Sequence, residues 1–103
     1  MAKFLVTYHA NEMPHDLESM TRAREAFMQW AEKTGPALSE PGAPVAATKV
    51  VSASGVSEGP ASSPLNGWSV IDAPDAATAA AILADHPFIE RGGQLQINEP
   101  VEF

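Results

Sequence analysis

Two histidines are the residues of this sequence best suited to acid–base chemistry. His86 directly follows Asp85 at the end of a predicted helix, and His9 closes a predicted strand. An imidazole can take up or release a proton near neutral pH, and the C-terminus of a helix favours its charged form. We therefore take His86, His9 and Asp85 as candidate catalytic residues. Two alternatives involve no chemistry: His86 caps the carbonyls at the helix end, or His9 is a partly exposed residue at a strand end.

Four further residues near these histidines have side chains that could contact a small ligand. Tyr8 and Thr7 come just before His9, and Trp68 and Ser69 begin another predicted strand. The alternative for the two aromatic residues is a place in the core, with the Tyr8 hydroxyl satisfied at its rim.

The loop that follows the first predicted strand contains several possible metal ligands. His9, Glu12, His15 and Asp16 crowd together there, and all are possible metal ligands. However, the H-x-x-E-x-x-H spacing falls in a proline-containing loop, whereas the helical H-E-x-x-H motif places both histidines on one helix face. We expect no metal. The sequence also has no G-x-S-x-G elbow and no phosphate-binding loop, so we expect no cofactor.

The elements that must position these residues alternate between strands and helices. Strands are predicted at Lys3–His9, Ala46–Ser52, Trp68–Asp72 and Gln94–Asn98, helices at Leu17–Thr34 and Ala76–Asp85, a loop at Pro36–Pro44 and an extended connection at Gly55–Gly67. Asp16 and Asp75 precede the helices as N-caps. The order β-α-β-β-α-β predicts an α+β, ferredoxin-like antiparallel sheet with two helices on one face.

Strand alternation divides the side chains of this sheet into two faces. The more apolar set, which we expect to meet the helices, is Phe4, Val6, Tyr8, Trp68, Val70, Leu95 and Ile97. The mixed set is Leu5, Thr7, His9, Ser69, Ile71, Gln94, Gln96 and Asn98. The mixed set is too apolar for bare solvent and too polar for a dry core. It predicts a homodimer whose facing sheets enclose a partly wet small-molecule cavity; the alternative is a monomer with a solvated second face.

Length and composition limit the possible partners. The 103 residues fit one domain, residues 1–103. The net charge is −7 and the six basic residues are scattered, which disfavours nucleic acid and anionic membranes as partners. Cysteine is absent, which excludes disulfides and thiolate chemistry. Residues 1–4 lead straight into a strand without a signal peptide, so we expect a cytoplasmic protein.

Four segments resemble the YCII-related proteins. They read KFLVTYH at Lys3–His9, GVSEGP at Gly55–Pro60, NGWSVIDAPD at Asn66–Asp75 and ILADHPFIERGGQLQI at Ile82–Ile97, and their order and spacing hold across nearly the whole chain. The resemblance implies a dimeric α+β barrel.

Some members of that family carry a histidine on the first helix and an aspartate just before the proline after the second helix, a pair suspected of acid–base chemistry. Here the first helix has no histidine, and His86 is the residue before Pro87. That pair therefore does not carry over to this chain.

Three classes of function remain open at this point. The first is an enzyme, such as an isomerase or lyase, that uses His9 or His86 as its proton carrier. The second is a non-catalytic domain that binds or senses a small metabolite. The third is a structural assembly module without a ligand.

Overall fold

A computed structural model describes residues 2–11, 15–60 and 65–101 of the chain. The strands are β1 (Ala2–His9), β2 (Leu38–Pro44), β3 (Lys49–Ser52), β4 (Gly55–Glu58), β5 (Gly67–Ala73) and β6 (Gln94–Asn98). The helices are α1 (Leu17–Thr34), α2 (Ala76–Leu83) and α3 (Pro87–Glu90), with a short 3-10 turn, η1 (Gly35–Ala37), after α1. None of the helices in these ranges is long and apolar enough to cross a membrane.

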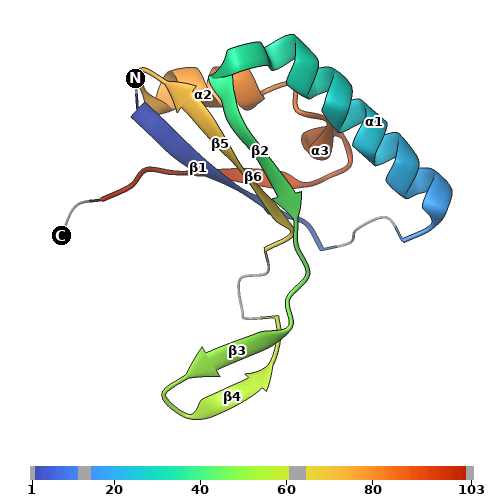
Figure 1. Ribbon diagram of the computed structural model, residues 1–103, viewed down its shortest axis with the longest axis vertical. Helices are drawn as coiled ribbons and strands as arrows, with labels where there is room; N and C mark the ends of the chain where they lie inside the picture. Colours follow the sequence, from blue (N-terminus) through green and yellow to red (C-terminus); the bar gives the residue numbers. More distant parts are fainter. Residues whose placement is uncertain (1, 12–14, 61–64, 102–103) are drawn as a thin grey trace.

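Four strands form the main sheet, in the order β2-β5-β1-β6, and every neighbouring pair is antiparallel. The helices lie on one side of this sheet (Figure 1). Their shared core is apolar and includes Phe4 and Val6 of β1, Ile71 of β5, Trp30 of α1 and Phe88 of α3. The predicted α+β class with an antiparallel sheet is confirmed, and the arrangement is compatible with a ferredoxin-like fold.

The two predicted helix starts are present as N-caps. Asp16 accepts a hydrogen bond from the Ser19 amide at 2.8 Å, and Asp75 accepts one from the Thr78 amide at 2.8 Å. A carboxylate satisfies amides that the first turn of a helix leaves without a partner. These caps fix where α1 and α2 begin, and so they fix how both helices leave the sheet.

The second strand of the main sheet differs from the prediction. This strand is β2, at Leu38–Pro44, and it lies in the stretch that was predicted to be a loop. The second strand had been predicted at Ala46–Ser52. It lies at the sheet edge and pairs with β5 through two register shifts, so it tolerates prolines that a central strand would not. Gly42 has φ +71°, and a Cβ there would lie 1.8 Å from the Trp68 carbonyl oxygen, so this close approach requires glycine.

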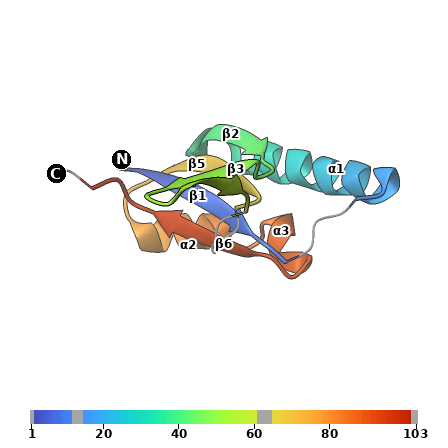
Figure 2. The ribbon, with the colours of Figure 1, turned by 90° about the horizontal axis from the view of Figure 1, so that it is seen from below.

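A separate two-stranded hairpin follows β2. Its strand β3 covers part of the predicted second strand, and β4 occupies the start of the predicted extended connection. We call residues 45–60 the arm. Its root continues the β2–β5 pair, because the Val45 amide donates to the Asn66 carbonyl at 2.9 Å. The arm projects past the end of the main sheet (Figure 1), and it overlaps the sheet when the molecule is seen from below (Figure 2).

The two faces of β5 are the reverse of the prediction. Ser69 and Ile71 are 1% and 0% exposed and lie beneath the helices, opposite Val6 and Phe4 in the register. Trp68 and Val70 lie instead on the other face, opposite Thr7 and Leu5. Both faces of this strand carry apolar residues, so alternation alone could not tell which one the helices cover.

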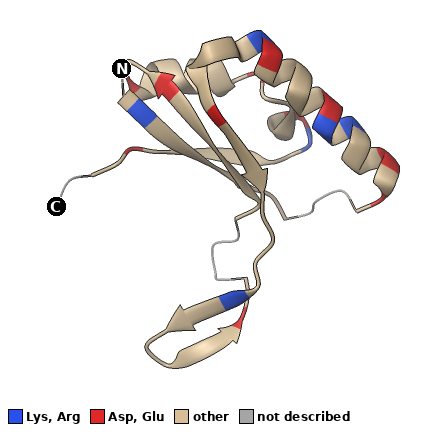
Figure 3. Cartoon of the chain, in the orientation of Figure 1, with Lys and Arg blue, Asp and Glu red and all other residues tan. Residues whose placement is uncertain are grey.

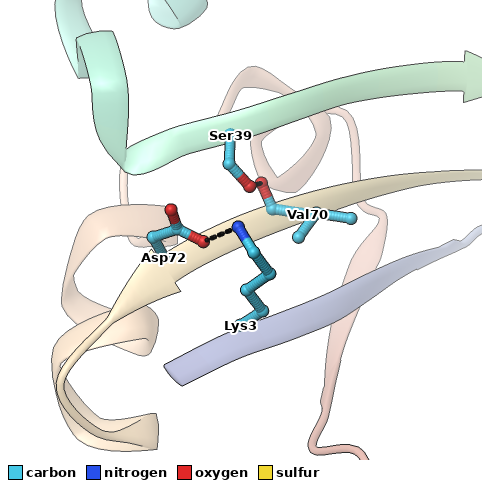
Figure 4. A network of polar contacts seen from close by, with 4 residues as sticks. All are labelled: Lys3, Ser39, Val70 and Asp72. Carbon is cyan, nitrogen blue, oxygen red and sulfur yellow. Dashed lines mark hydrogen bonds and ion pairs between the residues drawn. The ribbon is translucent and has the colours of Figure 1, made fainter. Parts of the chain in front are cut away.

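We call the uncovered side of the main sheet the open face. From β2, Glu40 and Ala43 lie on this face, because they pair with Val70 and Trp68 of β5. From the other three strands its side chains are Lys3, Leu5, Thr7, His9, Trp68, Val70, Asp72, Gln94, Gln96 and Asn98. One end carries an ion pair, in which Lys3 Nζ lies 2.9 Å from Asp72 Oδ1 (Figure 4). This lysine lowers the pKa of the Asp72 carboxyl. The nearby Ser39 hydroxyl of β2 points at the Val70 carbonyl, 3.4 Å away.

Candidate functional site

Six of the candidate site residues predicted from the sequence form two groups, one on each face of the main sheet. Tyr8, Ser69 and His86 meet beneath the helices. Thr7, His9 and Trp68 lie on the open face. Strand β1 presents successive side chains to opposite faces, so Tyr8 points one way and its neighbours Thr7 and His9 the other. Asp85, the seventh candidate, belongs to neither group, so the candidates do not form one site.

The buried group is a chain of hydrogen bonds through three side chains, which we call the buried relay. His86 Nε2 lies 2.9 Å from the Tyr8 hydroxyl, which lies 2.7 Å from Ser69 Oγ. Ser69 in turn donates to the Pro41 carbonyl of β2 at 2.7 Å. The relay thus links the segment between α2 and α3 to strands β1, β5 and β2.

The direction of the protons in the buried relay follows from one bond. His86 Nδ1 accepts a hydrogen bond from the Phe88 amide at 3.0 Å, so the neutral ring carries its proton on Nε2 and donates it to the Tyr8 oxygen. Tyr8 then donates to Ser69, whose own proton goes to Pro41. Each polar atom of the three side chains is used, which accounts for how they can be buried without cost to the fold.

The position of His86 corrects two expectations. It is the N-cap of α3 and not a cap on the carbonyls of the preceding helix, and it is 1% exposed. It packs against Trp30, with ring centroids 4.3 Å apart. Burial, helped by the nearby Arg91 charge, lowers the pKa of His86 to about 4, although Asp85 acts in the opposite direction. The ring is therefore neutral at pH 7, whereas a position at a helix C-terminus had suggested a charged form.

Tyr8 is held in its protonated form by the same surroundings. Burial raises the pKa of its hydroxyl, and the hydrogen bond with Ser69 only partly offsets this. A neutral phenol and a neutral imidazole suit the relay, because each has a proton to donate and an oxygen or nitrogen to accept. The geometry gives the buried relay a structural role in joining the helices to the sheet.

Asp85 faces away from the buried relay. Its Oδ1 accepts from the Trp30 indole at 3.0 Å, and its Oδ2 pairs with Lys33 of α1. These contacts, with that to Lys33 first, lower the pKa of the carboxyl, so it is ionised at neutral pH. Asp85 thereby ties the end of α2 to α1.

The second group, on the open face, combines polar side chains from β1 and β6 with an aromatic ring from β5. We call Thr7, His9, Trp68, Gln96 and Asn98 the open-face cluster. His9 Nε2 lies 2.8 Å from Thr7 Oγ1, and Asn98 Nδ2 donates to the same oxygen at 3.2 Å. Gln96 pairs with Thr7 in the register and donates to Asn98 Oδ1 at 2.5 Å. The cluster offers an imidazole, a hydroxyl and two amides within one small area.

Gln96 and Asn98 were placed on this face by the sequence but were not singled out as ligand-binding. The sequence QLQIN of β6 does contain a signal for this role. Its side chains alternate between the two faces, and this puts both amides on the same face as Thr7 and His9. Their contacts with Thr7 depend on β6 pairing with β1, which the chain order alone does not specify.

An open groove of about 930 Å³ runs along the edge strand β6 and reaches the open-face cluster. Its walls include His9 and Asn11, residues 94–97 of β6, and Leu83 of α2. It mixes polar and apolar groups, as small-molecule sites do. A ligand in this groove would contact His9 but not the buried relay.

The segment from the end of β1 to the start of α1 contains the possible metal ligands His9, Glu12, His15 and Asp16. Glu12 lies outside the described residues. Among the residues that are described, no three His, Cys, Asp or Glu side chains come together as a metal site requires.

Comparison with known proteins adds no relative. Neither a scan against protein-family models nor a search of the curated proteins finds a match to this chain.

Proposed function

We propose that two copies of the chain pair through their open faces, as a dimeric α+β barrel, and enclose a pocket for a small molecule. The observation that carries the proposal is the composition of the open face. Leu5 is 42% exposed there, beside the half-buried Trp68 and Val70. The helices lie on the other side of the sheet (Figure 1). This apolar surface stays in water until another surface covers it.

The charge distribution supports a second copy as the covering surface. The chain has a net charge of −7, so two copies repel each other over most approaches. Figure 3 shows many charged residues along α1 and few on the main sheet. On the open face, Lys3 and Asp72 form an ion pair at one end, and the acidic Glu40 of the edge strand β2 pairs with Val70 in the register. The open face therefore repels a second copy less than the charged surface of α1 would.

We assign proton transfer in this pocket to His9, with Thr7 as the residue that orients it. Imidazole is a common proton carrier near neutral pH, and a hydroxyl 2.8 Å away fixes its ring orientation. Trp68 offers a flat surface to a planar substrate, and the amides of Gln96 and Asn98 can bind polar substituents. Small keto acids and unsaturated lactones fit this combination, because their isomerisation requires a proton to move between carbon or oxygen atoms.

Membership of the YCII-related family is part of the same proposal. It is supported by KFLVTYH in β1 and by the segment from α2 to β6 that holds Pro87 and Gly93. The absence of cysteine fits a reducing compartment, which supports a cytoplasmic location.

A thermal-shift screen of small keto acids and lactones tests the pocket. A compound that binds the unmodified protein is expected to raise its melting temperature. The His9→Ala variant should lose at least tenfold in affinity for that compound. The matched control is His15→Ala, which removes an exposed histidine outside the open-face cluster and should bind as the unmodified protein does.

The same screen separates the functions that the sequence left open. Turnover that His9→Ala abolishes supports an enzyme, and ligand-dependent melting without turnover supports a binding or sensor domain. If His9→Ala and the unmodified protein bind every hit equally well, the pocket does not involve the open-face cluster.

A further inference from the structure

The arm has almost no contact with the body of its own chain. All of its residues from Val45 to Glu58 are exposed except Val50, which is half-buried. Val51 and Val56 face each other across the hairpin, and they are 78% and 68% exposed. The Cα radius of gyration is 14.9 Å, against about 13 Å for a compact domain of this length. The arm contributes to the excess, because it projects beyond the sheet (Figure 1).

A two-stranded hairpin of this kind is only marginally stable in water by itself. Four residue pairs hold β3 to β4, with an exposed ion pair between Lys49 and Glu58 at one end. Exposed ion pairs of this type contribute at most about 1 kcal/mol. The valine pair would stabilise the hairpin only where it is buried against another surface.

The direction of the arm indicates which surface that is. Figure 1 shows it leaving the end of the main sheet on the side away from the helices, which is the side of the open face. A second copy seated on the open face would therefore lie within its reach. A second copy of the chain can therefore cover the arm, and no other kind of partner is needed.

We infer that the arm of each chain embraces the second copy in the proposed dimer, with Val51 and Val56 buried against it. This inference rests on the proposed pairing of open faces.

The area of the open face supports the same conclusion. Four strands about 4.8 Å apart and about seven residues long, at 3.4 Å per residue, present roughly 450 Å². A stable interface buries about 800 Å² on each partner. Two reciprocal arms would add contact area to that of the open face in a twofold dimer.

Removing the arm tests the inference. The Gly59 amide donates to the Thr48 carbonyl at 3.1 Å, so residues 49–58 can be replaced by Asn-Gly, a two-residue hairpin turn, without moving the two ends. Sedimentation equilibrium over a dilution series should show a dimer dissociation constant at least 100-fold higher than that of the unmodified chain. Near-UV circular dichroism checks that the main sheet and helices are intact.

Single substitutions provide a test that does not depend on the deletion folding well. Val56→Ser should weaken the dimer at least tenfold. Val50→Ser is the matched control, because Val50 pairs with Ser57 and points to the opposite face of the hairpin. It should change the dissociation constant less than threefold.

Failure of the inference is distinguishable from failure of the proposed dimer. If the armless chain and Val56→Ser both dimerise as tightly as the unmodified chain, the arm does not bind the second copy, while the pairing of open faces stands. If the unmodified chain itself is a monomer, both proposals are overturned.

Discussion

Replacing His86 with alanine is expected to lower the free energy of unfolding by about 4 kcal/mol. The substitution empties a site that is 1% exposed between Trp30 and Tyr8. It removes the N-cap of α3, and it leaves the Tyr8 hydroxyl without its donor. The cavity accounts for about 2 kcal/mol of the loss, and the cap and the hydrogen bond contribute about 1 kcal/mol each. Urea denaturation at a fixed protein concentration measures the change.

Two variants make the His86 experiment specific. His15→Ala removes an exposed histidine and should change the free energy of unfolding by less than about 0.5 kcal/mol. His86→Asn keeps an oxygen that can accept from the Phe88 amide, so it should be more stable than His86→Ala. A loss of less than about 1 kcal/mol in His86→Ala would show that the buried relay does not hold the helices to the sheet.

Lowering the pH from 6.5 to 4 is expected to reduce the free energy of unfolding by an amount on the order of 3 kcal/mol. The pKa of His86 is about 4 in the folded chain, against an ordinary value of 6.5. Between these values the unfolded chain binds a proton that the folded chain excludes, so stability falls as the pH falls. Above pH 6.5 both states are neutral at this residue and the contribution is complete.

The comparison that isolates this effect is the same titration on His86→Asn, which lacks the buried imidazole and should show a much flatter profile between pH 6.5 and 4. The aspartates at the helix caps and ion pairs act in a different range, because their lowered pKa values lie below the ordinary value of 3.8. Equal slopes for the two proteins in this window would contradict a neutral, buried His86.

Local signals predicted the helices well. The aspartate before each long helix and Gly35 after α1 act through hydrogen bonds and backbone angles within a few residues. Such signals are visible in a sequence, because no distant part of the chain is needed to satisfy them. The prolines of β2 misled the prediction, since their effect depends on whether the strand lies at an edge of the sheet.

The candidate site was harder to predict, because it depends on which face of each strand the helices cover. Trp68 and Ser69 were assigned to the wrong faces of β5, because each of the two alternating sets of side chains in WSVID includes an apolar residue. When the faces of a strand are assigned the wrong way round, every side chain is placed on the wrong side. Ser69, which was expected on the mixed face, therefore lies in the buried relay. Similarly, the short helix α3 was not predicted. His86 was therefore interpreted as the end of the second helix, whereas in the structure it is the N-cap of α3.

The most direct test of the central claim is the mass of the unmodified chain in solution at micromolar concentration. Sedimentation equilibrium should give twice the chain mass of 10.9 kDa. Val70→Lys, which puts a charge in the middle of the open face, should give a single chain, and Ala80→Lys, on the exposed side of α2, should leave the dimer intact. A mass of 10.9 kDa for the unmodified chain throughout this range would contradict the pairing of open faces.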